Sequence, residues 1–232
     1  MQKTLLDLKE DVLDFFFPRF CSGCERKLMR GEFFLCVSCE MHLPKSAFAS
    51  YAENPIEILF KGRLPLRAGA SAFYFDKHGV VQRLVHGLKY SADHDLGRWM
   101  GRQMALEFTA SGRFTEIDML MAVPLHPKKA YLRGYNQSDW LIEGMQEHWD
   151  IAAGSSLKRV IFTESQTKKG KVERWLNVKD AFACQDPEEI EGKHIALVDD
   201  VITTGATLEA CGRELMRHGA DSISILCFAS AQ

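Results

Sequence analysis

The segment from Ile195 to Leu208 constrains the fold more than any other part of the chain. It opens with the apolar run Ile-Ala-Leu-Val, continues through the acidic pair Asp199 and Asp200, and passes through Thr-Thr-Gly into a helical pattern. A short apolar run of this kind is typical of a strand buried on both faces of a parallel sheet. Because ligands of such sheets bind at the carboxyl ends of the strands, we expect the acidic pair and the following turn to form a ligand site.

The turn after the acidic pair has the composition of a phosphate site. Thr203, Thr204, Gly205 and Ala206 place backbone N–H groups and hydroxyls at the N-terminus of the predicted helix, where the helix dipole favours an anion. Gly205 tolerates a positive φ and lets the backbone approach a phosphate closely. The alternatives are an ordinary strand–turn–helix connection and an acidic metal site after the strand. A Walker A loop is excluded, because no Gly-Lys-Ser or Gly-Lys-Thr sequence occurs.

Strand and helix patterns alternate along most of the chain. This alternation predicts an α/β domain with a central, mostly parallel sheet flanked by helices. The strands are expected at residues 67–76, 118–123, 157–162, 195–198 and 222–228, and the helices near residues 79–90, 94–112, 136–149 and 207–218.

Residues 45–66 contain the breakers Pro55 and Pro65. We therefore expect a linker over residues 45–66, between an N-terminal unit of residues 1–44 and the sheet domain of residues 67–232. The chain has 232 residues, which is enough for one domain of ordinary size plus a small module.

Four cysteines in the N-terminal unit have the spacing of a metal site. Cys21 and Cys24 form one Cys-x2-Cys pair, and Cys36 and Cys39 form a second. Each tight turn aims two thiolates at one point, so the two pairs complete a tetrahedral shell. We expect structural zinc there, with iron as the alternative, because four thiolates leave no open position for catalysis.

Cysteine usage indicates the compartment of the protein. The chain has seven cysteines, and it shows no signal peptide and no apolar run of the ~20 residues that a membrane span needs. We therefore expect a reducing compartment, the cytoplasm.

The net charge of the chain is −2. The protein therefore lacks the strong basic excess of a dedicated nucleic-acid binder.

Residues 2–17 have helical periodicity. Leu5, Leu8 and Val12 recur at helical spacing, which predicts a helix with one apolar face. We expect that face to pack on its own domain; the alternative is a docking surface for a membrane or a partner.

The segment Ile195–Leu208 resembles the signature of type I phosphoribosyltransferases, which bind phosphoribosyl pyrophosphate (PRPP). The signature is an apolar strand, two acidic residues, two apolar residues and Thr-Thr-Gly. Within that superfamily the chain resembles the ComF competence family. The resemblance rests on the four-cysteine unit, Gly87-Leu-Lys-Tyr90, the segment from Val123-Pro-Leu-His to Arg133-Gly-Tyr-Asn-Gln137, and the segment from Gln166-Thr through Arg174 and Asn177-Val to Ala181-Phe182.

The resemblance implies a type I phosphoribosyltransferase fold and PRPP binding with Mg2+. In that superfamily the turn holds the ribose 5-phosphate and the acidic pair holds the 2- and 3-hydroxyls. The residues expected to bind PRPP are Val198, Asp199, Asp200, Val201, Thr203, Thr204, Gly205, Ala206 and Thr207.

Catalysis would be displacement of pyrophosphate at the ribose C1, which needs cations to neutralise the leaving group. The candidate catalytic residues are the acidic pair Asp199 and Asp200 and the cations Lys128, Arg133, Lys168 and Arg174. Lys129 and Lys169 lie beside these cations in the sequence. We do not assign His126 as a base, since a histidine beside proline is more often structural. Lys89 matches the family, and from physical chemistry alone it could simply oppose the dipole of the preceding helix.

The basic segment from Gln166 to Arg174 resembles the hood loop that closes over PRPP in this superfamily. We expect it to be poorly ordered without ligand and to be ordered by PRPP with Mg2+, since closure would bring cations to the developing charge. The alternative is a mobile basic loop with no part in catalysis.

Two functions are compatible with these features. The first is a phosphoribosyltransferase that transfers a phosphoribosyl group to an acceptor, whose pocket would come from residues 44–112. The second is a DNA-uptake factor of natural transformation that uses PRPP as a regulatory signal, or that binds single-stranded DNA and the uptake machinery through its basic loops, without transferase activity.

Overall fold

The computed structural model describes Phe16, residues 18–160 and residues 181–231. The expected N-terminal helix, apart from Phe16, and the expected hood loop with Lys168 and Arg174 lie outside these residues. Within the part described, no helix has both the length and the apolar character to cross a bilayer.

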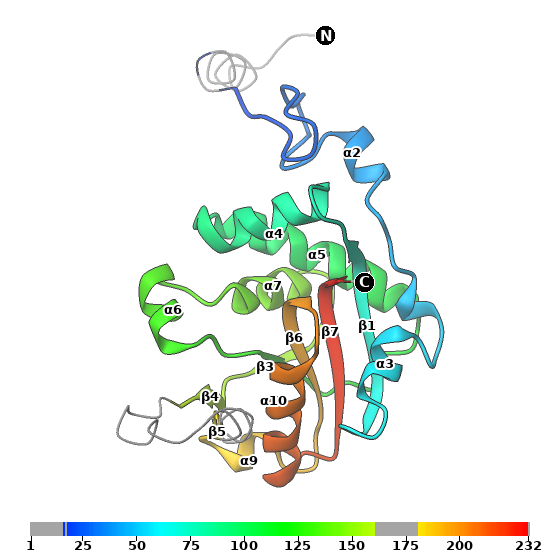
Figure 1. The fold of residues 1–232 in the computed structure, drawn as a ribbon, viewed down its shortest axis with the longest axis vertical. Helices are drawn as coiled ribbons and strands as arrows, with labels where there is room; N and C mark the ends of the chain where they lie inside the picture. Colours follow the sequence, from blue (N-terminus) through cyan, green and yellow to red (C-terminus); the bar gives the residue numbers. More distant parts are fainter. Residues whose placement is uncertain (1–15, 17, 161–180, 232) are drawn as a thin grey trace.

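A five-stranded sheet forms the centre of the molecule, in the order β1-β7-β6-β2-β3, with every neighbouring pair parallel (Figure 1). β6 lies in the middle, and its residues from His194 to Val198 are buried, which explains its continuous apolar run. The strands are β1 (Leu66–Phe75), β2 (Met119–Ala122), β3 (Ala152–Gly154), β6 (His194–Ile202) and β7 (Ser222–Ala231).

Helices cover both faces of the sheet. In Figure 1, α10 lies in front of β6 and β7, while α5 passes behind the strands. The helices of the sheet domain are α4 (Val80–Tyr90), α5 (His94–Ala110), α6 (Pro127–Arg133), α7 (Gln137–Gln146), α9 (Pro187–Ile190) and α10 (Ala206–Arg217).

The layer of α5 and α7 is packed backbone to backbone. A Cβ added at Gly101 would lie 2.0 Å from the Leu141 carbonyl oxygen, and one added at Gly144 would lie 2.0 Å from the Arg98 carbonyl oxygen. Only glycine permits this approach at either position. The close contact fixes α7, whose first residues carry part of the functional site.

This architecture confirms the predicted α/β class and the parallel central sheet. Two strands differ from the predictions. β6 continues through the acidic pair to Ile202, because β7 pairs with it along its whole length, including Asp199 with Cys227. The strand expected at residues 157–162 is not part of the central sheet. Instead β4 (Leu157–Arg159) pairs antiparallel with β5 (Phe182–Cys184) in a separate two-stranded sheet.

The fifth strand of the central sheet, β3, was not predicted from the sequence. Its residues Ala-Ala-Gly lie at the edge of the sheet, and none of them is buried, so no apolar run or alternation marks the strand.

The segment expected as a linker is packed structure. It holds a 3-10 turn, η1 (Phe48–Ser50), and the helix α3 (Pro55–Phe60), and it buries Ile56, Phe60 and Leu64 in the core. Pro55 occupies the first position of α3, where the missing N–H of proline costs no hydrogen bond. It therefore begins a helix here and does not break one. The boundaries of the units themselves stay a prediction.

The basic stretch after Val123 consists of an irregular segment, residues 123–126, and a helix. α6 begins at Pro127, with the His126 side chain accepting a hydrogen bond from the Lys128 backbone N–H at 3.2 Å, and it ends at Arg133, with Gly134 at a φ of 79° as its C-cap. His126 thus has the role of a helix cap.

Candidate functional site

Asp200 is the best-anchored member of the acidic pair. It is 4% exposed, and both carboxylate oxygens have a partner. Lys89 Nζ lies 2.8 Å from Oδ1, and Gln137 Nε2 donates to Oδ2 at 2.8 Å. A buried carboxylate is costly unless it is paired and hydrogen-bonded, so Lys89 and Gln137 offset the cost of burying the Asp200 side chain.

The two partners of Asp200 come from two different sequence motifs. Lys89 belongs to Gly87-Leu-Lys-Tyr90 at the end of α4, and Gln137 ends Arg133-Gly-Tyr-Asn-Gln at the start of α7. Lys89 therefore does more than oppose a helix dipole. The two motifs, far apart in the sequence, meet at one carboxylate on β6.

The remaining residues of both motifs hold this junction together. The Tyr135 hydroxyl donates to the Leu88 carbonyl oxygen at 2.7 Å, which ties α7 to α4. Asn136 caps α7 and donates to the Val123 carbonyl oxygen at 3.2 Å. Gly87 allows close packing, since a Cβ there would lie 2.9 Å from Leu96 of α5.

Arg133 extends the junction toward the surface. Its guanidinium donates to the Gln137 side-chain oxygen and lies 5.8 Å from the ring centre of Tyr90 and 5.9 Å from that of Tyr135. Because Gln137 in turn donates to Asp200, a single polar chain connects Arg133 to the acidic pair.

Asp199 has a different environment. It is partly buried, and its Oδ1 accepts from the Asp200 backbone N–H at 2.8 Å and from the Ser138 hydroxyl at 3.5 Å. Burial and the neighbouring charge of Asp200 raise the pKa of Asp199 to about 7. No described cation forms an ion pair with Asp199, so this carboxylate is the one available to a ligand.

The turn after β6 has the backbone that a phosphate site needs. Gly205 adopts a φ of 71° immediately before α10, a conformation that favours glycine. Thr203, Thr204 and Ala206 are exposed residues at the helix N-terminus, and the Ala206 N–H donates to the Thr204 hydroxyl oxygen at 3.5 Å.

Helix α3 and the residues that follow it contact this turn. A Cβ on Gly205 would lie 2.6 Å from the Phe60 ring, so the ring packs directly against the turn. Arg63 donates from Nη1 to the Thr204 carbonyl oxygen at 2.9 Å and from Nε to Glu209 Oε2 at 2.9 Å. The segment expected as a linker is therefore a structural part of the site.

A cavity of about 280 Å³ joins the acidic pair to the basic residues. Both cations and carboxylates line it, and Lys89 pairs with Asp200 there. Burial lowers the pKa of His126, and the neighbouring charges of Arg159, Lys128 and Lys129 lower that pKa further. The lining residues are Lys89, Tyr90, Val123, Pro124, Leu125, His126, Lys129, Arg133, Gln137, Arg159, Asp199, Asp200 and Thr207.

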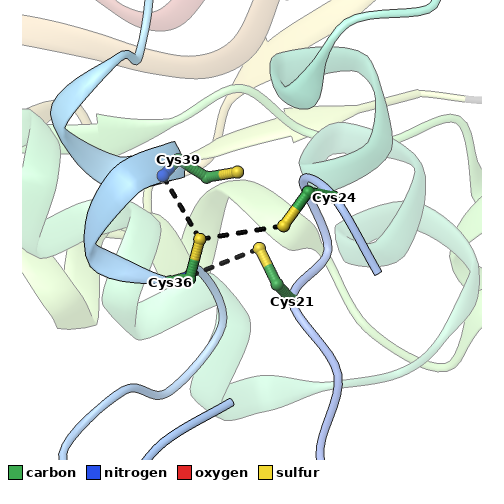
Figure 2. A group of neighbouring side chains, drawn as sticks. All are labelled: Cys21, Cys24, Cys36 and Cys39. Carbon is green, nitrogen blue, oxygen red and sulfur yellow. Dashed lines mark hydrogen bonds between the residues drawn. The ribbon is translucent and has the colours of Figure 1, made fainter. Parts of the chain in front are cut away.

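The four N-terminal cysteines converge on one point (Figure 2). Their sulfur atoms all lie within 4.8 Å of one another, and the Sγ atoms of Cys24 and Cys36 are 3.8 Å apart. A tetrahedral ion with metal–sulfur bonds of about 2.3 Å requires sulfur–sulfur distances of about 3.8 Å. The donor set therefore fits a structural metal ion such as zinc.

Backbone N–H groups prepare these thiols for a metal. The N–H of Cys39 donates to Cys36 Sγ at 3.3 Å, and this bond is the main cause that lowers the pKa of Cys36 to about 6. The N–H groups of Gly23 and Cys36 donate to Cys21 Sγ at 3.2 and 3.3 Å. Hydrogen bonds of this kind favour the thiolate, which is the form that binds metal.

Comparison with known proteins identifies the family. DNA utilization protein YhgH of Salmonella typhimurium is 33% identical over 212 residues, which cover 89% of this chain and 88% of that protein. Competence protein F of Haemophilus influenzae is 28% identical over 222 residues, which cover 91% of this chain and 90% of that protein. The chain belongs to the ComF family.

Other matches cover parts of this ComF protein. The family described as "Phosphoribosyl transferase domain" matches residues 152–232, from β3 to the end of the chain. YhgH of Escherichia coli strain K12 is 32% identical over 151 residues, and the match covers 62% of this chain and 64% of that protein. Among solved structures, the Bacillus subtilis glutamine PRPP amidotransferase has a TM-score of 0.42 at 19% identity, covering 58% of this chain and 26% of that one.

The sequence-predicted site residues of this ComF protein are distributed unevenly. Asp199, Asp200, Arg133 and Thr207 line the cavity together. Lys128 is exposed on α6 and is not among the lining residues, whereas its neighbour Lys129 is. Val198 and Val201 belong to β6 itself, where Val198 is buried.

Several residues of the site were not predicted from the sequence. Gln137 and Tyr90 lie in the family motifs, but their types alone do not indicate a role. Phe60 and Arg63 contact the turn from about 140 residues away, as the separation of Arg63 from Thr204 shows, so no local pattern could indicate them. Arg159 of β4 lines the cavity through a strand whose place in the fold was predicted differently.

The raised pKa of Asp199 predicts a pH-dependent stability of this ComF protein without ligand. An unfolded aspartate titrates near 3.8 and the folded one near 7, so the folded chain binds the extra proton between these values. The free energy of unfolding should therefore fall as pH rises from about 4 to about 7. Asp199→Asn should remove this slope and be the more stable protein at pH 8, by at most about 4 kcal/mol. Urea unfolding at pH 5 and pH 8 measures the difference.

The matched control is Asp186→Asn, which removes a charge from an exposed carboxylate. It should leave the pH slope of the wild type unchanged. An Asp199→Asn protein with the same pH slope as the wild type would show that Asp199 titrates normally in the fold.

Proposed function

We propose that this ComF protein binds PRPP together with Mg2+ in the cavity beside Asp199. The observation that carries the proposal is the difference between the environments of the two aspartates. Lys89 and Gln137 occupy both oxygens of Asp200, which leaves Asp199 available beside the turn that begins with the exposed Thr203 and Thr204 at a helix N-terminus. A carboxylate next to an anion site suits a sugar phosphate, whose hydroxyls donate and whose phosphate accepts.

The proposed binding mode assigns each end of PRPP to a group of residues. The 5-phosphate would lie on the turn from Thr203 to Thr207, and Asp199 would accept from the ribose hydroxyls. The pyrophosphate would face Lys129, Arg133 and Arg159, the described cations that line the cavity along with Lys89. Mg2+ would neutralise the pyrophosphate, and it prefers the oxygen ligands that carboxylates and phosphates offer.

We propose that the chemistry is transfer of the phosphoribosyl group with release of pyrophosphate. Such a reaction needs a held 5-phosphate, fixed hydroxyls and a neutralised leaving group, and the cavity offers a residue for each task. Lys168 and Arg174 stay candidate cations for the closing loop, by resemblance to the superfamily.

A second candidate function is single-stranded DNA binding, and one observation favours it. On α6, Tyr131 is 88% exposed and Leu132 is 84% exposed, close to the exposed Lys128 and Lys129. Exposed aromatic rings beside basic residues are typical of surfaces on which bases stack. The names of the relatives, DNA utilization protein and competence protein, agree with a role in DNA uptake for those proteins.

For the metal site we propose zinc, which prefers four thiolates in a tetrahedron and has no redox chemistry. A four-thiolate site is typical of a reducing compartment, and we propose the cytoplasm.

The PRPP proposal predicts the effect of neutralising the acidic pair. Asp199→Asn combined with Asp200→Asn should weaken PRPP binding by about 10-fold or more, since a hydrogen bond to a charged acceptor contributes about 1.5–3 kcal/mol. Isothermal titration calorimetry with PRPP at millimolar Mg2+ measures the affinity. The matched control is Asp186→Asn combined with Asp221→Asn, which makes the same charge change at two exposed carboxylates and should bind like the wild type.

Wild-type protein that gives no heat with PRPP and Mg2+ would end the PRPP proposal. The same titration with single-stranded DNA at low and high salt tests the second candidate. Tight, strongly salt-dependent binding that Tyr131→Ala weakens, without any PRPP binding, would favour the DNA-uptake function.

The metal proposal predicts one zinc ion per chain. A chelator should loosen the N-terminal module and leave the sheet domain folded, because metal binding supplies folding free energy only where its ligands lie. Elemental analysis of protein purified without added metal, with far-UV circular dichroism before and after chelation, measures both effects. Iron, or no metal at all, in such a preparation would be evidence against zinc.

A further inference from the structure

Helix α4 connects the four-cysteine module to the acidic pair. Arg83 lies near the start of this helix and Lys89 near its end. They are six positions apart in the helix, a distance of about 9 Å along the axis. Figure 1 shows the N-terminal module lying beyond α4 and α5, on the side away from α10.

The Arg83 guanidinium joins the first cysteine turn to the start of α4. Nε donates to the Ser22 carbonyl oxygen at 2.8 Å, and Nη2 donates to the Gly23 carbonyl oxygen. Ser22 and Gly23 are the two residues between the metal-site cysteines Cys21 and Cys24. Nη1 donates to the His78 carbonyl oxygen at 2.9 Å, in the turn that precedes the helix.

Direct packing supports the same contact. A Cβ on Gly23 would lie 2.7 Å from Cys39 Sγ and 3.2 Å from Val80, the first residue of α4. The glycine therefore lies between the second cysteine pair and the helix. Its close fit makes the position of α4 depend on the closed form of the cysteine module.

The N-cap residue of α4, Gly79, makes no side-chain cap hydrogen bond. The Gln82 side-chain oxygen accepts from the His78 backbone N–H just before it. One face of the helix is buried against the core through Val81, Leu84, Val85 and Leu88. Arg83 links the outer side of the first turn to the cysteine turn.

The other end of α4 carries contacts that need accurate placement. Lys89 has to remain within 2.8 Å of a carboxylate that is 4% exposed, and the Leu88 carbonyl oxygen has to meet the Tyr135 hydroxyl. A small rotation or shift of the helix would separate both pairs and leave a buried charge without its partner.

We propose that Arg83 is a positioning residue that makes the four-cysteine module part of the ligand site. It holds α4 on the closed cysteine turn, and α4 in turn holds Lys89 on Asp200. The inference rests on the proposed PRPP binding for its functional consequence. The module would then affect the affinity for PRPP without touching PRPP.

A double-mutant cycle tests this route. Arg83→Ala should weaken PRPP binding by about 5-fold, within the range of coupling between residues of one network. Lys89→Met should weaken it as well, and adding Arg83→Ala to Lys89→Met should change the affinity by less than about 2-fold. Arg83→Lys should restore only part of the affinity, because an ammonium lacks the fork that bonds two carbonyls at once.

The matched control is Arg67→Ala, which removes another exposed arginine at the start of β1, where it pairs with the exposed Glu116 at the opposite end of the sheet from the site. It should leave PRPP affinity unchanged. Equal affinity of Arg83→Ala and the wild type would overturn the proposal. So would a full additional loss when Arg83→Ala is introduced into Lys89→Met, because a purely structural effect adds to the loss of Lys89.

A second readout needs no ligand. Amide hydrogen exchange at residues 87–91 should accelerate in Arg83→Ala and after chelation, but not in Arg67→Ala, since loosening α4 exposes its last turn. Unchanged exchange there would overturn the proposal even if PRPP did not bind. Conversely, faster exchange with no PRPP binding by the wild type would contradict the proposed function and keep the coupling of the module to α4.

Discussion

The pairing of Asp200 with Lys89 and Gln137 is the interaction on which the rest of the site depends. A carboxylate that is 4% exposed on the central strand of a sheet would be costly without partners. The two partners come from α4 and α7, so satisfying this charge fixes both helices relative to β6. The placement of the site residues therefore follows from the pairing of one buried carboxylate. The residues that pair with this carboxylate belong to the family motifs.

The same principle explains the unequal roles of the two neighbouring aspartates. Asp200 is fully paired, whereas burial and the neighbouring charge of Asp200 raise the pKa of Asp199. It is then the group with most to gain from a ligand that donates hydrogen bonds or brings a cation. The turn beyond it is held by Phe60 at the end of α3 and by Arg63, which follows that helix, so the turn keeps its geometry without a ligand.

The sequence predicted the parts of the fold that have a strong local signal. The apolar run of β6, the following turn and the four cysteines each combine residue type with short-range spacing, and the structure brings each set together. The residues that were missed act over long range. Arg63 and Phe60 reach the turn from a segment whose prolines indicated a linker, and β3 is a short edge strand without an apolar pattern. Lys89 and Gln137 are visible as motif residues, but only the tertiary structure shows that they share one partner.

A structure of the protein with PRPP and Mg2+ tests the central claim most directly. The account predicts that the 5-phosphate lies on the backbone amides of Thr203 to Ala206 and that Asp199 accepts from the ribose hydroxyls. It also predicts that Asp200 keeps its contacts with Lys89 and Gln137. Ligand bound elsewhere, or a bound ribose that displaces Lys89 from Asp200 to reach that carboxylate, would contradict it.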